Sequence, residues 1–433
     1  MKSVGLLCLA LLLLYNISDA VVWYVHPDST MNCIEDCLDS CFMGDTVLVG
    51  PGLYHENIVW PPTESITLMS EYGPDTTIID GDSSYMGSVI WFMWGADTTT
   101  IIRGFTIRGG YPASFPGGGI YCGGSSLIIE DNIITMNIAD DAGAGIMIVD
   151  ASPVIRHNVI SYNVSTYEGG GGIQIGLSPW QLSDHLQQGR HRNSSPQIIN
   201  NTITHNTAQQ GAGINCYLNT SNGTVIVGNT IADNTAEIGG GIFCFESSPA
   251  ILSNTIIDNV ATNEGGGIYC WVGSSPTIDS NSISNNSSGG IFCGHMSSPI
   301  IHYNNINDNI WYGVANMDST ITIDATNNWW GDATGPYHPT ANPGGLGNLV
   351  SDYVDFIPWL TGPGFEEQPI VEPVEGSKTI HATIFRGPLQ LPEGKKCKVY
   401  DITGRIVEST KIQPGIYFIE VDGVVTQKVV KVR

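Results

Sequence analysis

The chain has 433 residues, of which 42% are apolar and 52 are glycine, so it can form more than one domain around a large core. Its formal net charge of −25 is unevenly spread: residues 378–433 hold ten Lys and Arg against five Asp and Glu, whereas residues 1–377 hold six basic and 36 acidic residues. Such an acidic surface repels phosphate backbones and anionic membranes, which excludes nucleic-acid binding.

The first 20 residues have the pattern of a secretory signal peptide. Lys2 precedes an apolar run over 6–14, and small residues at 18–20 would form the cleavage site. The run is too short to span a membrane, and a lipid anchor at Cys8 is a weaker alternative. We therefore expect an exported chain that begins at Val21 and has no transmembrane segment.

Residues 29–42 are the clearest helix candidate. Cys33, Cys37 and Cys41 recur every four residues and would share one helical face. Two interpretations follow: a thiolate metal site, or a cap helix that buries small residues over the first coil. The cap is favoured because the open end of a repeat protein exposes strand edges. Residues 21–43 are accordingly assigned to an N-terminal strand and cap helix.

One short phrase then recurs from residue 117 to residue 330. It is clearest as Gly-Gly-Gly-Ile-Tyr-Cys at 117–122 and 265–270 and as Gly-Gly-Gly-Ile-Phe-Cys at 239–244. A turn follows each copy, and then a phrase of the form Asn-x-Ile-x-x-Asn. Each period contains three short strand-like stretches and leaves no room for a helix. A fixed period of this kind predicts a solenoid, here a parallel β-helix with three strands per turn over residues 44–360.

Alternation along the strands predicts which side chains point into the core. The inward isoleucines are Ile120, Ile146, Ile173, Ile214, Ile242, Ile268 and Ile291. The row two residues later holds Cys122, Ile148, Ile175, Cys216, Cys244, Cys270 and Cys293. Free stacked thiols are favoured there over disulfides between neighbouring coils, although the spacing allows both. An Asn column (132, 158, 201, 229, 254, 281, 304) is expected to adopt a left-handed turn and to stack its amides into a ladder.

This ladder resembles the right-handed β-helix family, the pectin-lyase-like superfold. The opening phrase from Gly44-Asp45 resembles the first coils of secreted members, and Asn327–Gly331 resembles a closing rung in which Trp329 and Trp330 would cover the far end of the core. The resemblance implies the fold but says little about chemistry.

The C-terminal part has a different composition. Residues 361–377 are rich in Pro, Gly and Glu, as in a linker. Residues 378–433 alternate as short antiparallel strands, and the phrases at 400–405 and 414–418 resemble the Por-type (type IX) secretion sorting domain, a small β-sandwich. The resemblance implies recognition by an outer-membrane export machinery and a location outside the cell or on its outer surface. An accessory β-sandwich is the alternative.

Catalytic phrases of the superfold are largely missing. Its lyases pair a calcium-binding acidic cluster with a Lys or Arg base, and only Arg156, Arg190 and Arg192 lie within the repeats. Its hydrolases use paired acids and a Gly-His-Gly phrase, of which only Asp140-Asp141 and Gly294-His295 occur here. A lone Asp-Asp in a turn is more often solvated surface. We therefore predict no catalytic residue and favour a binding protein over an enzyme.

A candidate binding face lies outside the Gly-Ile-x-Cys strand, because the residues one and three positions after the inward Ile should point outward. Aromatic rings stack on sugars, and carboxylates bind sugar hydroxyls or calcium. The predicted binding residues are Tyr217, Phe243, Phe245, Tyr269, Trp271 and Phe292 on an exposed sheet face, with Asp141, Glu168, Glu237 and Glu264 in one column of the preceding turn. The insertion at 176–193 or another chain could cover this face instead.

Three functions stay open. The preferred one is a secreted or surface β-helix that binds a polysaccharide or another cell-surface ligand, with Ca²⁺ as the only cofactor that the acids suggest. The second is a lyase or glycoside hydrolase with an unusual acidic site, since inverting hydrolases need two carboxyl groups roughly 6.5–9.5 Å apart. The third is a structural spacer or adhesin.

Overall fold

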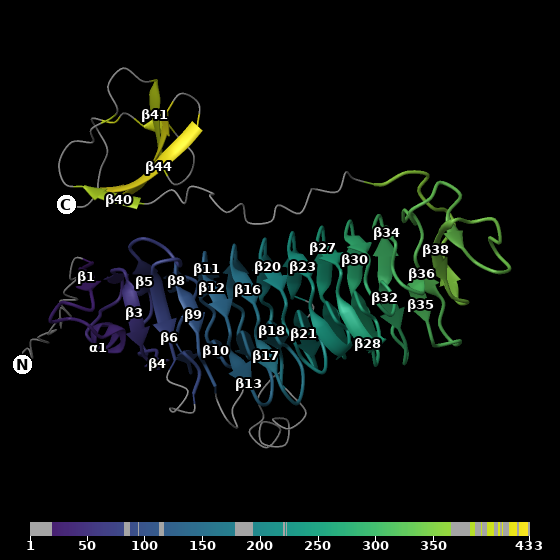
Figure 1. Cartoon of the computed structure of the whole chain (residues 1–433), viewed down its shortest axis with the longest axis horizontal. Coiled ribbons are helices and arrows are strands. Elements are labelled where there is room, and N and C mark those ends of the chain that lie inside the picture. The colour runs from purple at the N-terminus through teal and green to yellow at the C-terminus, as the bar shows by residue number, and fades with distance from the viewer. Residues whose placement is uncertain are drawn as a thin grey trace, which may run out of the picture.

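The computed structural model is an all-β parallel solenoid with almost no helix (Figure 1). It describes residues 20–81, 87–93, 95–111, 117–177, 194–219, 221 and 223–364, together with 382–385, 391, 396–401, 406–407, 409, 415–421 and 424–431. Most of the predicted signal peptide, of the insertion at 176–193 and of the predicted linker lies outside these residues. No helix among the described residues is long and apolar enough to cross a membrane.

Three long sheets of parallel strands form the walls of the solenoid. The 13 strands of sheet A are β1 (Val22–Val25), β2 (Thr46–Val49), β5 (Thr67–Ser70), β8 (Ile101–Arg103), β11 (Ile128–Glu130), β15 (Val154–Arg156), β19 (Gln197–Ile199), β22 (Val225–Val227), β26 (Ala250–Leu252), β30 (Thr277–Asp279), β33 (Ile300–His302), β36 (Ile323–Asp324) and β39 (Val354–Asp355). The 10 strands of sheet B are β3 (Gly52–His55), β6 (Thr77–Asp80), β9 (Thr106–Arg108), β12 (Ile133–Thr135), β16 (Val159–Ser161), β20 (Thr202–Thr204), β23 (Thr230–Ala232), β27 (Thr255–Ile257), β31 (Ser282–Ser284) and β34 (Asn305–Asn307).

Sheet C contains the repeated Gly-Ile-x-Cys strand and carries the candidate site. Its 12 strands are, in spatial order, β4 (Ile58–Val59), β7 (Ile90–Phe92), β10 (Ile120–Gly123), β14 (Ile146–Val149), β18 (Ile173–Ile175), β21 (Ile214–Tyr217), β25 (Ile242–Phe245), β29 (Ile268–Trp271), β32 (Ile291–Cys293), β35 (Tyr312–Asn316), β38 (Gly347–Val350) and β37 (Pro336–Tyr337). Two short pairs flank it: β13 (Ile138–Ala139) with β17 (Val164–Ser165), and β24 (Thr235–Ile238) with β28 (Val260–Glu264).

The predicted inward rows form the core. Ile214, Ile242 and Ile268 pair in register across β21, β25 and β29, and each has no exposed surface. Cys244 and Cys270 pair in the same way and are equally buried. All nine cysteines among the described residues are free thiols, including the five in the inward row, for which the sequence favoured free thiols.

The asparagine ladder forms, but its backbone geometry differs from the prediction. Amide-to-amide bonds of 2.9–3.1 Å run from Asn132 through the predicted column to Asn328. The left-handed residue is the one before each Asn, such as Asp131 (φ 56°) or Ser253 (φ 51°), and not the Asn itself. That residue turns the chain, so the Asn side chain can point inward and bond its neighbours. A second ladder, from Asn137 to Asn348, has bonds of 3.0–3.2 Å.

The two ends also refine the predictions. The helix α1 spans only Ile34–Asp39, where the Glu56 carboxylate accepts bonds from the Ile34 and Glu35 amides at 2.9–3.0 Å. At the other end Trp330 is fully buried in the core and Trp329 only half-buried. The Trp pair does not close the solenoid, because β37, β38 and β39 add further strands beyond it.

The described C-terminal strands form one mixed five-stranded sheet. In spatial order these strands are β40 (Ala382–Phe385), β44 (Val424–Lys431), β43 (Gly415–Val421), β41 (Cys397–Asp401) and β42 (Ile406–Val407). β40 pairs with β44 in parallel and the other pairs are antiparallel. The predicted antiparallel β-sandwich remains a prediction.

Candidate functional site

The outer face of sheet C carries two rows of side chains that behave differently. We call the residues one position after the inward Ile the first outer row and those three positions after it the second outer row. On β21, β25, β29 and β32 the first outer row is Asn215, Phe243, Tyr269 and Phe292. The second outer row there is Tyr217, Phe245 and Trp271, followed by Gly294 just after β32.

The first outer row is not exposed, which corrects the prediction for three of its aromatic residues. Phe243, Tyr269 and Phe292 keep only 2%, 3% and 7% of their surface accessible. They stack on one another, with ring centroids of Phe243 and Tyr269 5.4 Å apart, and Ile238 and Tyr312 pack against them. The turn before the glycines thus folds over this row and makes a second small core outside the sheet, so these rings cannot stack on a ligand.

The second outer row is half-buried and reaches solvent. Tyr217 and Phe245 stack with centroids 4.6 Å apart and planes 9° apart. Trp271 stacks on Tyr269 at 5.3 Å and meets the His295 ring edge-on at 4.2 Å. A ledge of rings thus runs along the sheet, one ring per coil and about 4.8 Å from coil to coil.

The acids do not form the single column that was predicted. β24 and β28 change register between Ala236 and Ile238, so Glu264 pairs with Ile238 and not with Glu237. Glu168 and Glu237 do share a row, joined through the backbone of Gln209 at 2.9 and 3.0 Å. Glu237 is exposed, whereas Glu168 and Glu264 are half-buried.

Glu264 supports the covered row. The Tyr269 hydroxyl donates to its carboxylate at 3.1 Å. Burial, and then the Glu264 charge, raise the pKa of Tyr269 well above its ordinary value. Asp141 lies half-buried near the start of β14, several coils away. Among the described residues no group of three or more His, Cys, Asp or Glu is placed to hold a metal, so calcium binding stays a prediction.

The described arginines of the solenoid lie on other walls. Arg103 pairs with Glu130 and Asp131 on sheet A, and Arg156 also bonds Glu130, at 2.8 Å. Arg108 on sheet B pairs with Asp80 at 2.8 Å. In the part of sheet C that the structure describes, no strand carries a Lys or Arg. A lyase-type basic residue is therefore missing from the described face.

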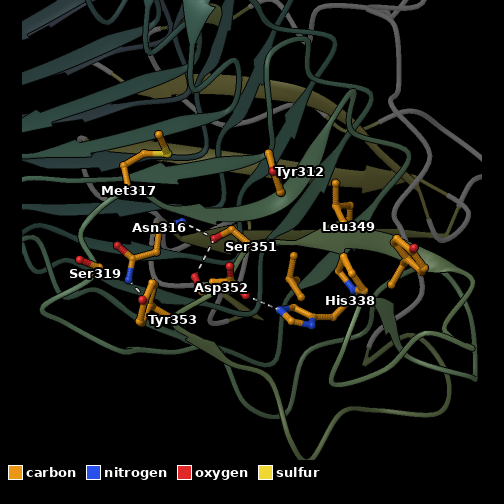
Figure 2. A pocket seen from close by; sticks show the side chains of 12 residues that line it. Tyr312, Asn316, Met317, Ser319, His338, Leu349, Ser351, Asp352 and Tyr353 are labelled. Carbon is orange, nitrogen blue, oxygen red and sulfur yellow. Dashed lines mark hydrogen bonds and ion pairs between the residues drawn. The ribbon is translucent and has the colours of Figure 1, made fainter.

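A pocket that the sequence did not predict lies at the C-terminal end of sheet C (Figure 2). Its volume is about 430 Å³, and β35, β38 and the segments that follow β35, β37 and β38 line it. Tyr312 belongs both to this lining and to the cluster around the covered aromatic row. No repeated phrase marks residues 312–353, so only the folded chain brings them together.

The polar groups of the pocket are held in place. His338 Nε2 lies 3.3 Å from the Asp352 carboxylate, while the backbone amides of Thr340 and Ala341 donate to Nδ1 at 3.3 and 3.0 Å. Nδ1 of His338 therefore acts as an acceptor, and Nε2 is the ring nitrogen nearer to Asp352. Ser351 Oγ accepts from the backbone N–H of Asn316 at 2.7 Å.

A family model described as a right handed beta helix region matches residues 191–333. The match and the parallel solenoid together establish a β-helix repeat protein. No curated protein matches the sequence. Similar solved structures include an alginate lyase from Paenibacillus sp. str. FPU-7 (13% identity, TM-score 0.35, 77% of this chain and 99% of that chain) and the Azotobacter vinelandii mannuronan C-5 epimerase AlgE6 A-module (15% identity, TM-score 0.35, 66% of this chain and 93% of that chain). Neither likeness is close enough to assign an activity.

Proposed function

We propose that this protein is a β-helix that binds a glycan along the second outer row of sheet C. The observation that carries the proposal is the half-exposed ledge of Tyr217, Phe245 and Trp271, one aromatic side chain on each of three successive coils. Rings held by stacking lose little freedom when a ligand arrives, and a regular row suits a regular polymer. Glu237, exposed on β24 in the turn that precedes β25, is available to sugar hydroxyls.

The chain's organisation fits an exported binding protein. In this proposal residues 1–20 direct export, 21–43 cap the solenoid, 44–360 form the binding solenoid, 361–377 are a linker, and 378–433 engage an outer-membrane secretion machinery. The acidic solenoid and the basic tail support a division into separate modules. α1 contacts β1, β2 and β4 and buries Ile34 and Leu38, which supports the cap.

Affinity gel electrophoresis tests the binding proposal. The purified protein is run through gels that contain neutral or acidic polysaccharides, with and without calcium. We expect retardation in at least one gel, and its loss in Phe245→Ala/Trp271→Ala. The matched control is Tyr162→Ala/Tyr303→Ala, which removes two exposed aromatic side chains from other walls and should leave retardation unchanged. Unchanged migration through every gel would overturn the proposal.

A second variant locates the ligand without deleting a ring. A Cβ added at Gly294 would lie 2.3 Å from the Trp271 ring, so Gly294→Ala must displace the indole while the core stays intact. We expect weaker retardation, with an unfolding midpoint close to that of the parent protein. Unaltered retardation would place the ligand elsewhere on the surface.

A glycoside hydrolase is the second candidate, because Glu168 and Glu237 share a row two coils apart. Two coils correspond to about 10 Å between backbones, near the upper limit for the two acids of an inverting hydrolase. The same gels distinguish the two functions. Clearing of the embedded polymer that disappears in Glu168→Gln and in Glu237→Gln would establish an enzyme, whereas a binder retards without clearing.

A further inference from the structure

The C-terminal pocket continues the proposed binding row. Met317 occupies the second outer row on the coil after Gly294, since Cys293 pairs with Asn316, and it is 64% exposed. Met317 and Tyr312 both line the pocket. A ligand that follows the row past Trp271 therefore reaches the pocket without leaving the outer face of sheet C.

The pocket has the size and the walls of a sugar subsite. Its volume of about 430 Å³ lies within the usual range of roughly 300–1,000 Å³ for small-molecule sites. Tyr312, Tyr337 and Tyr353 give it three partly exposed rings. Ser351 and Asn316 bond to each other and to nearby backbone carbonyls, so the floor is rigid before any ligand arrives.

The charges in the pocket select the class of sugar. Asp352, on the rim, is the one acidic side chain of the lining, and the lining contains no Lys or Arg. His338 is buried and its Nδ1 accepts from two backbone amides, so it does not present a free cation to the pocket. An anionic sugar would meet this carboxylate without a compensating charge, whereas hydroxyl groups can donate to it.

We propose that this pocket is the terminal subsite of the row and binds one uncharged sugar residue, with Asp352 accepting its hydroxyl groups. The assignment rests on the proposed glycan binding along the second outer row. It names the ligand class, a neutral glycan, and excludes a polyuronate at this position.

The test compares short oligosaccharides of neutral β-1,4-glucan, mannan and xylan with oligogalacturonate, by calorimetry on the full chain. We expect at least one neutral series to bind and the uronate series to bind weakly or not at all. Tyr337→Ala should weaken binding of the neutral ligand about tenfold, and Tyr337→Phe should retain it. Asp352→Asn should weaken binding of the neutral ligand and reduce the ratio of its affinity to that of the uronate. Tyr303→Ala, which removes an exposed ring from another wall, is the control.

The outcomes separate this inference from the proposed function. If polysaccharide gels retard the protein through Phe245 and Trp271 but the Tyr337 and Asp352 variants bind as the parent does, the subsite is wrong and the row stands. Tighter binding of the uronate than of the neutral ligands, with or without calcium, would also contradict the assignment of the pocket to an uncharged sugar. If no gel retards the protein, the proposed glycan binding along the second outer row is itself wrong. Melting curves of each variant show whether it is folded.

Discussion

The inner and outer faces of sheet C are built by the same strands but follow different rules. Inside, apolar side chains stack in register from coil to coil, and Ile242, Cys244, Ile268 and Cys270 are all fully buried. Outside, two positions of one strand diverge: Phe243 is buried and Phe245 is half-exposed. Alternation therefore predicts the direction of a side chain, but burial on the outer face depends on what the neighbouring turn places over it.

Phe243 departs most strongly from the expectation that an outward-pointing side chain is exposed. We expect Phe243→Ala to lower the free energy of unfolding by about 3–5 kcal/mol, as much as a core deletion such as Ile268→Ala, because it empties a packed site. The matched Phe245→Ala should cost roughly 1 kcal/mol. Guanidinium unfolding midpoints measure both. Equally small losses of stability in the two variants would mean that the first outer row is exposed to solvent.

Two adjacent residues of the asparagine ladder should also differ in how much a substitution lowers stability. The Asn254 side chain makes four bonds of 2.8–3.0 Å to its neighbours, so Asn254→Ala leaves buried groups unpaired and should cost about 3 kcal/mol. Ser253, with φ 51°, should accept Ser253→Gly within about 1 kcal/mol, since glycine tolerates that conformation. The same unfolding experiment compares them, and a larger loss at Ser253 would contradict the assignment of the ladder.

The thiol row predicts a pH dependence. Bonds to the neighbouring thiols and burial raise the pKa of Cys216 well above its ordinary value of 9.0, and the pKa values of Cys244 and Cys270 are raised well above 9.0 too. Unfolded thiols ionise first, so the stability that these groups contribute is present below about pH 9 and declines as pH rises further. We expect Cys244→Ala to flatten this alkaline decline in unfolding midpoints. The native ladder should also resist thiol reagents at pH 9, and rapid labelling would contradict its burial.

Glu264 should show the smallest effect. Glu264→Gln keeps an acceptor for the Tyr269 hydroxyl and should change stability by less than about 1 kcal/mol. Absorbance titration should find the pKa of Tyr269 lower than in the parent but still above its ordinary value, because burial is the larger cause of its shift. A return to the ordinary value would show that the row opens when this bond is weakened.

Much of the molecule was predictable from local patterns. The period of the Gly-Ile-x-Cys phrase and the strict alternation of side chains determined the parallel β-helix, its Ile and Cys rows, and the amide ladder. Each of these features depends on contacts between equivalent residues of neighbouring coils. Such contacts can be predicted from the sequence wherever the repeat is regular.

Only the tertiary structure decided the candidate site. The register change between Ala236 and Ile238 moves Glu264 out of the predicted column, and the folded turn buries the first outer row. The pocket brings together Tyr312, His338 and Asp352 from the irregular last coils, where no repeated pattern predicts which residues come into contact. Sequence alone determined the regular wall and its two outward rows, and packing against that wall determined which of them a ligand can reach.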